Sequence, residues 1–427
     1  MELRDQVEKI LGYGPICDHC LGRFFGKRSH GLSNDERGRA LRISRALRHN
    51  LPFVSETQPC WICSDLFTHL DDWAERACRA LSGIEYSTFL VGTKVPALMA
   101  ESEELVWSDL GLSDPEPFKA ETNREVGKRI SRRTGKEADI RHPHVVVILD
   151  LAADALAVQI NPLFIRGRYC KYERGIPQTR WFCRECHGVG CPRCGHSGKM
   201  YQDSVEELIG RHVIEQFSAQ DAILHGSGRE DIDACMVGSG RPFIMEAVSP
   251  RFRTVDLESL AEEINRCEEG RVSVTLDGFV DRPAVETIKS KQSHKKYRIL
   301  VEIDGRTSRE ELHDALNQLR GTIIFQRTPR RVAHRRADKI RERQVIDIKE
   351  MGIENDRILI EVTGEAGLYI KELISGDEGR TDPSLSGILG RNARVTRIDV
   401  LHVGSPEERE ESLPPKGSGE GDTHGTP

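Results

Sequence analysis

Apolar positions recur at helical spacing through the first part of the chain. Leu41, Ile43 and Leu47 roughly follow a helical stripe, and the Ser-Asn-Asp-Glu segment at residues 33–36 fits a capping box before it. A second stripe consists of Leu66, Phe67, Leu70, Trp73, Ala74 and Leu81. The pattern therefore predicts that residues 1–81 are helical.

Beyond this region the pattern becomes one of mixed strands and helices. Strands are predicted at residues 89–95, 144–151 and 155–164, with a helix at 122–133 between the first two. Residues 145–149 form a continuous and mostly β-branched apolar run. Such a run is typical of a strand that is covered on both faces.

The later part of the chain alternates in the same way. Helices are predicted at residues 204–217, 257–267 and 308–319, and strands at 296–303, 358–362 and 395–403. Residues 405–427 contain Leu413 as their only large apolar residue and are predicted to be disordered. Because 427 residues exceed one ordinary core, we expect an α/β (α+β) protein of two or three domains.

Composition indicates a soluble protein. The chain is 37% hydrophobic with a mean hydropathy of −0.48. No apolar run approaches the ~20 residues that cross a bilayer, and the first ten residues, MELRDQVEKI, lack a signal-peptide core. We therefore expect a cytoplasmic protein that does not bind membranes.

The net charge of −6 argues against a nucleic-acid partner, but the charge is unevenly distributed. Basic side chains cluster at residues 128–133, 166–180 and 327–343. A local basic face can bind phosphates because salt screens distant acids. The run at 327–343 lacks an aromatic ring apart from His334, which we expect to be a surface residue. It is typical of a phosphate track; the alternative is a solvated helix face.

Eight of the twelve cysteines form four C-x-x-C pairs, which in a cytosolic protein suggests metal sites before disulfides. Cys183, Cys186, Cys191 and Cys194 offer four thiolates within twelve residues, which predicts a structural Zn²⁺ site; free thiols or a redox dithiol are the alternatives. The other pairs are Cys17/Cys20 and Cys60/Cys63. A predicted helix separates these two pairs, so they share a zinc ion only if the fold brings them together. The alternative is two unrelated pairs, one of them redox active.

The segment Gly228-Arg229-Glu230-Asp231 places a carboxylate in a tight loop that starts with glycine, followed by Ile232 and Asp233. Glycine gives such a loop backbone freedom, so its acid can approach a ligand closely. The alternative is a surface turn capped by acids. A Gly-rich, β-like run follows.

These residues resemble the pseudouridine synthases, which carry their nucleophilic Asp in a short loop that one branch writes Gly-Arg-Thr-Asp. Gly367 to Leu373 (GLYIKEL) looks like the Gly-x-Tyr-Ile-Arg-x-Leu segment of synthases that act on the tRNA TΨC arm. The whole chain is similar to the archaeal-type tRNA pseudouridine synthases of positions 54 and 55. The similarity spans residues 10–404 and includes the paired C-x-x-C and residues 174–179, Arg-Gly-Ile-Pro-Gln-Thr. Lys371 stands where the better-known synthases have Arg.

The resemblance implies a domain order. It consists of a helical zinc-binding region at 1–84, a THUMP-like RNA-binding domain at 85–180, a zinc knuckle insert at 181–200, a mixed-sheet catalytic domain at 201–404 and a disordered tail at 405–427. The implied substrate is the TΨC arm of tRNA. The sequence indicates no organic cofactor and no obligatory protein partner.

The resemblance also assigns the site residues. Asp231 acts at C1′ of a flipped uridine, as nucleophile or as base, with Asp233 as second choice. Tyr297 and Tyr369 line the pocket, and Lys371 favours the ionised carboxylate. Arg229 fills or braces the vacated stack, and Leu373 supplies an apolar wall. The alternative function is a non-catalytic, zinc-containing RNA-binding protein; a zinc-dependent chaperone partner is more distant, because the chain has a single C-x-x-C-x-G-x-G repeat.

Overall fold

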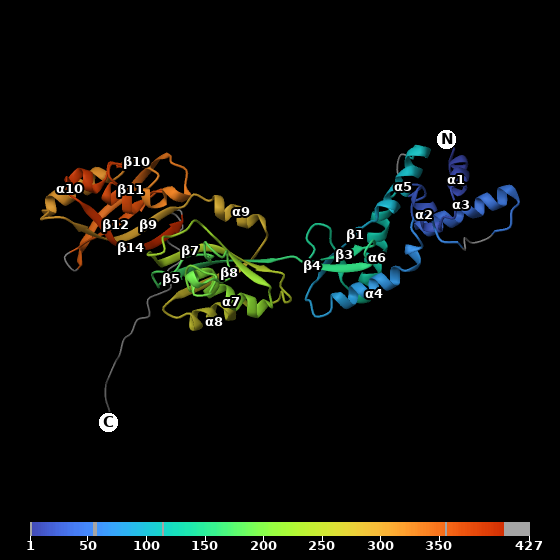
Figure 1. Ribbon diagram of the computed structural model, residues 1–427, viewed down its shortest axis with the longest axis horizontal. Coiled ribbons are helices and arrows are strands. Elements are labelled where there is room, and N and C mark those ends of the chain that lie inside the picture. Colours follow the sequence, from blue (N-terminus) through green and yellow to red (C-terminus); the bar gives the residue numbers. More distant parts are fainter. Residues whose placement is uncertain (1, 54–57, 113–114, 355–356, 405–427) are drawn as a thin grey trace, which may run out of the picture. The chain divides into compact units, whose positions relative to one another are not determined.

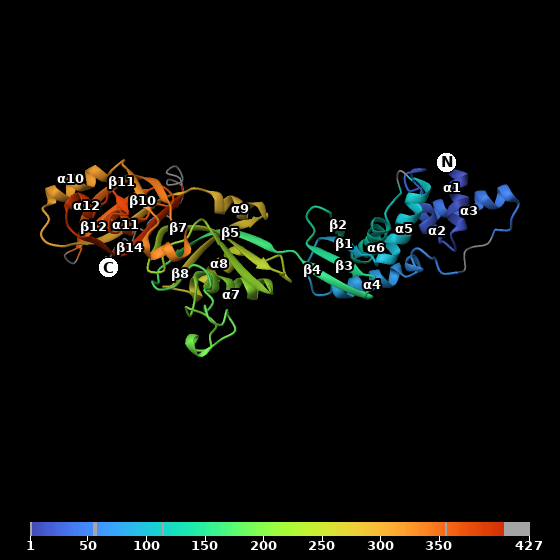
Figure 2. The ribbon, with the colours of Figure 1, turned by 45° about the horizontal axis from the view of Figure 1, so that its top comes forward.

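The structure is a computed structural model that describes residues 2–53, 58–112, 115–354 and 357–404. The side chains of His334 and Arg335 and the tail at 405–427 lie outside the described residues, so the expectations for His334 and for the tail stay predictions. The chain divides into two compact units, seen in Figures 1 and 2. Unit 1 consists of Met1–Pro162 and Ser249–Thr254, and unit 2 consists of Leu163–Val248 and Val255–Pro427.

Unit 1 begins with helices, as the sequence predicts. They are α1 (Leu3–Gly12), α2 (Asp18–Arg23), α3 (Asn34–His49), the short η1 (Leu66–Thr68) and α4 (Leu70–Ala80). The predicted capping box is confirmed at the start of α3, where the Ser33 amide donates to the Glu36 carboxylate at 2.8 Å. This bond satisfies an amide that the first turn of a helix otherwise leaves unpaired.

A small sheet with helices completes unit 1. Its elements are β1 (Thr88–Lys94), α5 (Ala97–Leu110), α6 (Phe118–Thr134), β2 (Glu137–Ala138), β3 (Val145–Asp150) and β4 (Ala155–Ile160). The strand order is β2-β1-β3-β4, with β1 parallel to β3 and β3 antiparallel to β4. Burial alternates along β3, where Val145, Val147 and Leu149 are fully buried and the residues between them are half-buried. No residue of this strand is exposed, so the expected cover is complete on one face and partial on the other.

Unit 2 is built on one large mixed sheet with the order β13-β10-β11-β12-β9-β14-β7-β5-β8, and β6 pairs with β7. The strands are β5 (Leu163–Lys171), β6 (Asp221–Gly226), β7 (Cys235–Val248), β8 (Val272–Val280), β9 (His294–Ile303), β10 (Ile323–Arg327), β11 (Ile340–Glu354), β12 (Arg357–Gly364), β13 (Thr381–Asp382) and β14 (Ala393–Gly404). The helices are η2 (Pro192–Cys194), α7 (Val205–Phe217), α8 (Leu257–Cys267), α9 (Pro283–Ser290), α10 (Arg309–Leu319), η3 (Arg330–Arg335), α11 (Ile370–Ser375) and α12 (Leu385–Leu389).

The large sheet carries two large apolar cores and a small third cluster of Phe164, Ile244 and Val285. Residues of α7 and α8 pack with β5, β7 and β8 in one core, and residues of α10, α11 and α12 pack with β9 to β12 in the other. The two halves meet where β14 pairs in parallel with β7 and antiparallel with β9. This junction positions the loop before β7 next to β9 and α11.

The predicted strand at 155–164 is two strands in the structure. β4 ends at Ile160, and β5 begins at Leu163 after Asn161 and Pro162. Proline has no amide to donate to a ladder, so the run is interrupted there. β5 then pairs with β7 and β8, so residues 163–180, which we expected within the THUMP-like domain, lie in unit 2. Among the described residues, no helix is long and apolar enough to span a membrane.

Candidate active site and metal centres

A cavity of about 230 Å³ opens beside the loop that precedes β7. Its lining comes mainly from four segments: this loop, strand β9, the turn η3 and the start of α11 with the residues just before it. The sequence-predicted residues that line it are Asp231, Tyr297, Tyr369, Lys371 and Arg229. Segments that are far apart in the sequence thus meet at one cavity, which lies within unit 2.

The carboxylate of Asp231 lies against two cations. Arg331 Nη1 donates to Asp231 Oδ1 at 3.0 Å, and Lys371 Nζ lies 3.6 Å from Asp231 Oδ2. Arg331 Nε also pairs with Glu372 at 2.7 Å. Burial acts to lower the pKa of Arg331, but the two carboxylates raise it above its usual value. The Arg331 guanidinium that contacts Asp231 is therefore also held by Glu372.

Asp233 is the more open of the two aspartates. Its side chain is 65% exposed, against 31% for Asp231. Lys371 Nζ lies 2.7 Å from Asp233, and although burial opposes the effect, this ammonium lowers the pKa of the Asp233 carboxyl. Asp233 does not line the cavity that Asp231 lines. The geometry thus gives Asp231 the enclosed position and leaves Asp233 as a surface partner of Lys371.

Glu230, the third residue of the Gly-Arg-Glu-Asp loop, lies beneath it rather than in solvent. Its carboxylate accepts hydrogen bonds from the Tyr169 hydroxyl at 2.8 and 2.9 Å and lies 2.7 Å from Arg241 Nε. The side chains of Glu230 and Arg241 are each 1% exposed. Gln178 Nε2 donates both to the Tyr169 hydroxyl and to the Gly228 carbonyl. This buried network fixes the loop from below.

Lys171, on β5, holds the same loop through its backbone. The side chain is fully buried, and Nζ donates to the carbonyl oxygens of Ile176 at 3.0 Å, Ile232 at 3.2 Å and Asp231 at 3.4 Å. Burial lowers the pKa of this lysine. Three carbonyls use all three donors of an ammonium, so Lys171 holds the backbone at Asp231 in place.

Two tyrosines face the cavity. Burial, with a smaller contribution from Asp231, raises the pKa of Tyr297 to about 12. The Tyr297 hydroxyl therefore stays protonated at neutral pH and can donate a hydrogen bond. The Tyr369 hydroxyl accepts from Arg336 Nη1 at 3.1 Å, and the Tyr369 backbone amide and carbonyl bond to the buried Gln326 side chain at 2.8 and 3.0 Å. Gln326 thus fixes the residue that precedes α11.

Of the other two predicted residues, Arg229 lies at the cavity and Leu373 lies elsewhere than expected. Arg229 is exposed, with its guanidinium 5.8 Å from the ring centroid of Trp181. Leu373 is fully buried in the core under α11 and does not line the cavity. Because α11 begins at Ile370, Leu373 lies one turn later and packs on the sheet. The apolar lining that this segment contributes comes instead from Leu368 and Ile370.

The basic run at 327–343 does not form a helix face. It spans the end of β10, the turn η3 and the start of β11. Part of its charge is used within the unit, because Arg327 pairs with Asp338 at 2.6 Å and Arg331 pairs with Asp231. The alternative of a solvated helix face is therefore wrong, and the phosphate track stays a prediction for the rest of the run.

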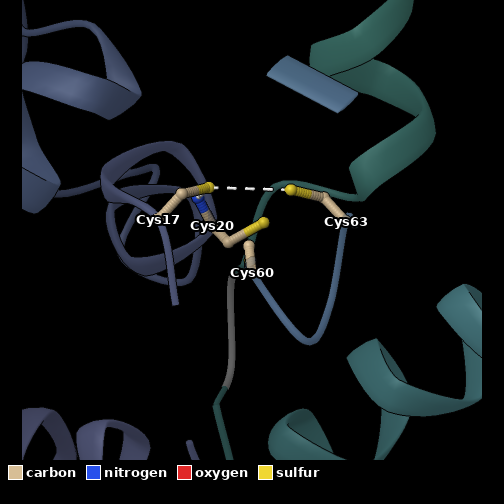
Figure 3. Close-up of side chains that lie close together, drawn as sticks. All are labelled: Cys17, Cys20, Cys60 and Cys63. Carbon is tan, nitrogen blue, oxygen red and sulfur yellow. Dashed lines mark hydrogen bonds between the residues drawn. The ribbon is translucent and has the colours of Figure 1, made fainter. Parts of the chain in front are cut away.

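In unit 1 the fold brings two C-x-x-C pairs together. Cys17 and Cys20 come from the start of α2, and Cys60 and Cys63 come from the segment before η1 (Figure 3). Their four sulfur atoms lie within 4.8 Å of one another, and Cys17 Sγ is 3.7 Å from Cys63 Sγ. Four thiolates at about 2.3 Å from a tetrahedral Zn²⁺ are about 3.8 Å apart. The group could therefore hold one metal ion.

The second group lies in unit 2, between β5 and α7. Cys183 Sγ is 3.8 Å from Cys191 Sγ, and Cys186 Sγ is 3.8 Å from Cys194 Sγ. All four sulfur atoms lie within 4.8 Å of one another. Backbone amides donate to these sulfurs, Gly190 to Cys186 and Gly198 to Cys194, each at 3.2 Å. Such bonds favour thiolates, the form that binds a metal, so this group could also hold one metal ion.

Sequence reasoning missed residues that fix or line the cavity without belonging to its motif. Lys171 carried no signal of its own, because Arg166 and Arg168 precede it on the same strand. Arg241 and Lys295 lie in segments that carried the resemblance, but nothing marked their roles. Arg331 was hidden among the other basic residues of its run.

The chain matches two family models. Residues 164–404 match the model described as Pus10, C-terminal, and residues 73–150 match the one described as Pus10 THUMP domain, archaeal. A protein of Halorubrum lacusprofundi named tRNA pseudouridine synthase Pus10 is 45% identical over 423 residues, which cover 96% of this chain and 99% of the relative. A protein of the same name from Methanothrix thermoacetophila is 45% identical over 431 residues, covering 94% and 95%.

A weaker similarity exists to a solved structure. The chain resembles one in "Crystal Structure of a Cbf5-Nop10-Gar1 Complex" with a TM-score of 0.30 and 18% identity. The match covers 47% of this chain and 45% of the other.

Proposed function

The chain belongs to the Pus10 family and is a tRNA pseudouridine synthase, and we propose that it isomerises uridine 54, uridine 55 or both in the TΨC loop, with Asp231 as the nucleophile. The observation that carries the assignment of Asp231 is its place in the cavity. Two carboxylates line the cavity beside Tyr297 and Tyr369. Glu230 is paired with the buried Arg241, whereas Asp231 lies at the cavity with Arg331 3.0 Å away.

The chemistry requires such a carboxylate. Pseudouridine formation breaks the N1–C1′ glycosidic bond of a uridine, turns the uracil and rejoins it through C5. As N1–C1′ breaks, an Asp231 oxygen bonds to C1′, in the way that glycosidases use Asp and Glu. The bond between C5 and C1′ then forms, the carboxylate leaves, and the proton on C5 is replaced by one on N1. Arg331 and Lys371 would hold the carboxylate at the cavity through their ion pairs with it.

The target uridine has to leave its stack, which costs a few kcal/mol. We propose that Tyr297 stacks on the flipped base and that Tyr369 closes the other side of the cavity. Arg229, held against Trp181, would brace the space that the base vacates. Leu368 and Ile370 supply the apolar wall that we first expected from Leu373.

We further propose that the THUMP domain and the basic residues near the cavity hold the tRNA so that its TΨC arm reaches Asp231. Each cysteine group would hold one structural Zn²⁺, because four thiolates at this spacing fill the coordination shell. With no open position on the metal, the zinc ions would stiffen the fold and take no part in the reaction.

The test incubates the purified protein with an unmodified tRNA transcript and maps pseudouridine by carbodiimide-dependent primer extension. We expect stops at position 54, 55 or both with the wild type, and none with Asp231→Asn. tRNA affinity, measured by filter binding, should be similar for both proteins, since the variant keeps the size of the side chain.

Asp233→Asn is the matched control, because Asp233 lies in the same loop and also contacts Lys371. It should retain turnover within about tenfold, since it removes a surface ion pair of modest strength. An active Asp231→Asn variant would refute the nucleophile assignment. Stops only outside the TΨC loop would refute the proposed positions.

A further inference from the structure

Lys295 is a cation of the cavity for which the described residues provide no hydrogen-bond or ion-pair partner. It lies on β9 and lines the cavity with Tyr297. Residues two apart on a strand share a face, so both side chains point to the same side of the sheet. A Cβ atom built on Gly228 would lie 3.3 Å from Lys295 Nζ and 3.5 Å from Arg241 Nη1. The ammonium is therefore packed under the Gly-Arg-Glu-Asp loop.

Lys295 is half-buried, and charges with so little access to water are normally paired, because an unpaired charge loses hydration without compensation. The acid nearest to this end of the cavity is Glu230, and Arg241 already pairs with it at 2.7 Å. Arg336, another cation of the lining, donates to the Tyr369 hydroxyl. Lys295 thus adds a positive charge that the surrounding acids do not neutralise.

The surroundings of Asp231 have the opposite balance. Arg331 lies between Glu372 and Asp231, and Lys371 lies between Asp233 and Asp231. Two cations therefore face three carboxylates, which leaves about one negative charge at Asp231. The cavity is polarised, negative at Asp231 and positive at Lys295.

This polarity matches the charge that develops when a glycosidic bond breaks heterolytically. The sugar carbon C1′ becomes positive, and the electron pair of the N1–C1′ bond stays on the uracil as an anion spread over N1 and the carbonyl oxygens. We propose that Lys295 is a further catalytic residue, whose ammonium contacts the flipped uracil and stabilises this anion until C5 bonds to C1′. This role rests on the proposed function.

Lysine suits the task better than arginine. The uracil has to turn between the two bonds to C1′, so its negative edge changes direction during the reaction. An ammonium is a compact charge with three donors on a flexible stem, whereas a guanidinium favours one planar arrangement. Lys295 can therefore follow the turning ring. It stays protonated throughout, so the proton balance of the isomerisation does not change.

The test measures single-turnover release of tritium from a tRNA transcript that carries [5-³H]uridine, with enzyme in excess. Lys295→Met should slow turnover on the order of 100-fold, the effect of removing one preorganised donor from a developing anion. tRNA affinity and the melting temperature should not fall, because the variant removes a half-buried charge that has no ion-pair partner among the described residues. Lys296→Met is the matched control: it lies on the opposite face of β9, pairs with Glu361 at 2.6 Å, and should leave turnover nearly unchanged.

The pH profile gives a second readout. Burial, with Arg241 and Arg336 nearby and Glu230 opposing them, lowers the pKa of Lys295 to about 8. Only the charged form serves the proposed role, so the wild-type rate should fall as pH rises through about 8. Lys295→Met should lack this fall. Lys295→Arg stays charged, so its residual rate should be constant in this range.

Three results would overturn the proposal: wild-type turnover by Lys295→Met, loss of turnover matched by loss of tRNA affinity, or an alkaline fall that persists in Lys295→Met. If Lys295→Met does not fold, the profile of Lys295→Arg decides, since a fall unchanged from wild type would exclude Lys295 as its source. A wild type that forms no pseudouridine would refute the proposed function itself. Activity of the wild type with equal activity of Lys295→Met would remove only the role of Lys295.

Discussion

Replacement of Glu230 by Gln tests whether a buried ion pair holds the Gly-Arg-Glu-Asp loop. Gln has the size of Glu and can still accept a bond from the Tyr169 hydroxyl, but it removes the charge that faces Arg241 at 2.7 Å. Both side chains of the pair are 1% exposed, so water cannot replace the lost partner. The variant leaves a guanidinium buried without its counter-charge.

Breaking a buried pair in this way costs about 3–5 kcal/mol, and the retained Tyr169 bond favours the lower end of that range. In a domain of 150–250 residues, 1 kcal/mol shifts the melting temperature by about 2–4 °C. A cost of about 3 kcal/mol therefore lowers it by about 6–12 °C, measured by calorimetry of the full chain. Turnover should also fall, because the displaced loop carries Asp231.

Glu378→Gln is the control for loss of a surface charge. Glu378 pairs with Arg330, but its side chain is 71% exposed, so the change should cost less than about 1 kcal/mol. The double variant Glu230→Gln/Arg241→Met removes both charges and should be more stable than Glu230→Gln alone. Two results would contradict the argument that the pair supports the loop. One is a double variant that is no more stable than Glu230→Gln, and the other is a Glu230→Gln variant that melts at the temperature of the Glu378→Gln control.

Three further changes test other parts of the molecule. Lys171→Met removes three hydrogen bonds to backbone carbonyls, so turnover should fall at least about tenfold while tRNA affinity in filter binding is kept. Turnover equal to that of the wild type would show that Lys171 does not hold the loop in place. Cys183→Ser should lower the zinc content by about one ion per chain in mass spectrometry of the purified protein, and an unchanged content would exclude this site. The pKa of Tyr297 is raised from about 10 to about 12, so the folded state favours the protonated phenol. The free energy of unfolding of the wild type should therefore fall by roughly 2–3 kcal/mol relative to that of Tyr297→Phe as pH rises from 10 to 12. Urea unfolding at each pH measures the difference, which should be constant below pH 9.

The periodic elements of this fold could be predicted from the sequence. Helix α8 is observed at Leu257–Cys267, as predicted, because its apolar stripe is regular and Asp256 caps its start. The confirmed capping box at Ser33 is another local signal. Pro162 marks the break between β4 and β5 in the sequence and was overlooked. That β5 belongs to another sheet could not be predicted, because it depends on partners such as β8, which lies about a hundred residues later. Helix α5 was missed because its apolar positions do not form one stripe.

The cavity shows the same limit. The motif residues Asp231, Tyr369 and Lys371 were identified, because a resemblance of short segments marks them. The side chains beneath them were not, because their partners are remote: Tyr169 and Glu230 are 61 positions apart. A charged residue in a sequence does not reveal whether it will be exposed or paired in the interior. Only the folded sheet shows which charges support the loop and which face the cavity.

The lysine at position 371 illustrates how such a site tolerates a departure from its family pattern. The better-known synthases have Arg there, whose planar fork a lysine cannot reproduce. In this chain a guanidinium reaches Asp231 from another element, since Arg331 in η3 bonds to Asp231 and is anchored by Glu372, the residue next to Lys371. Lys371 then serves two aspartates as a single charge. Arg331 gives Asp231 one hydrogen bond and uses its planar fork on Glu372, while Lys371 supplies the second charge. Loss of Arg331 should therefore impair turnover more than loss of Lys371.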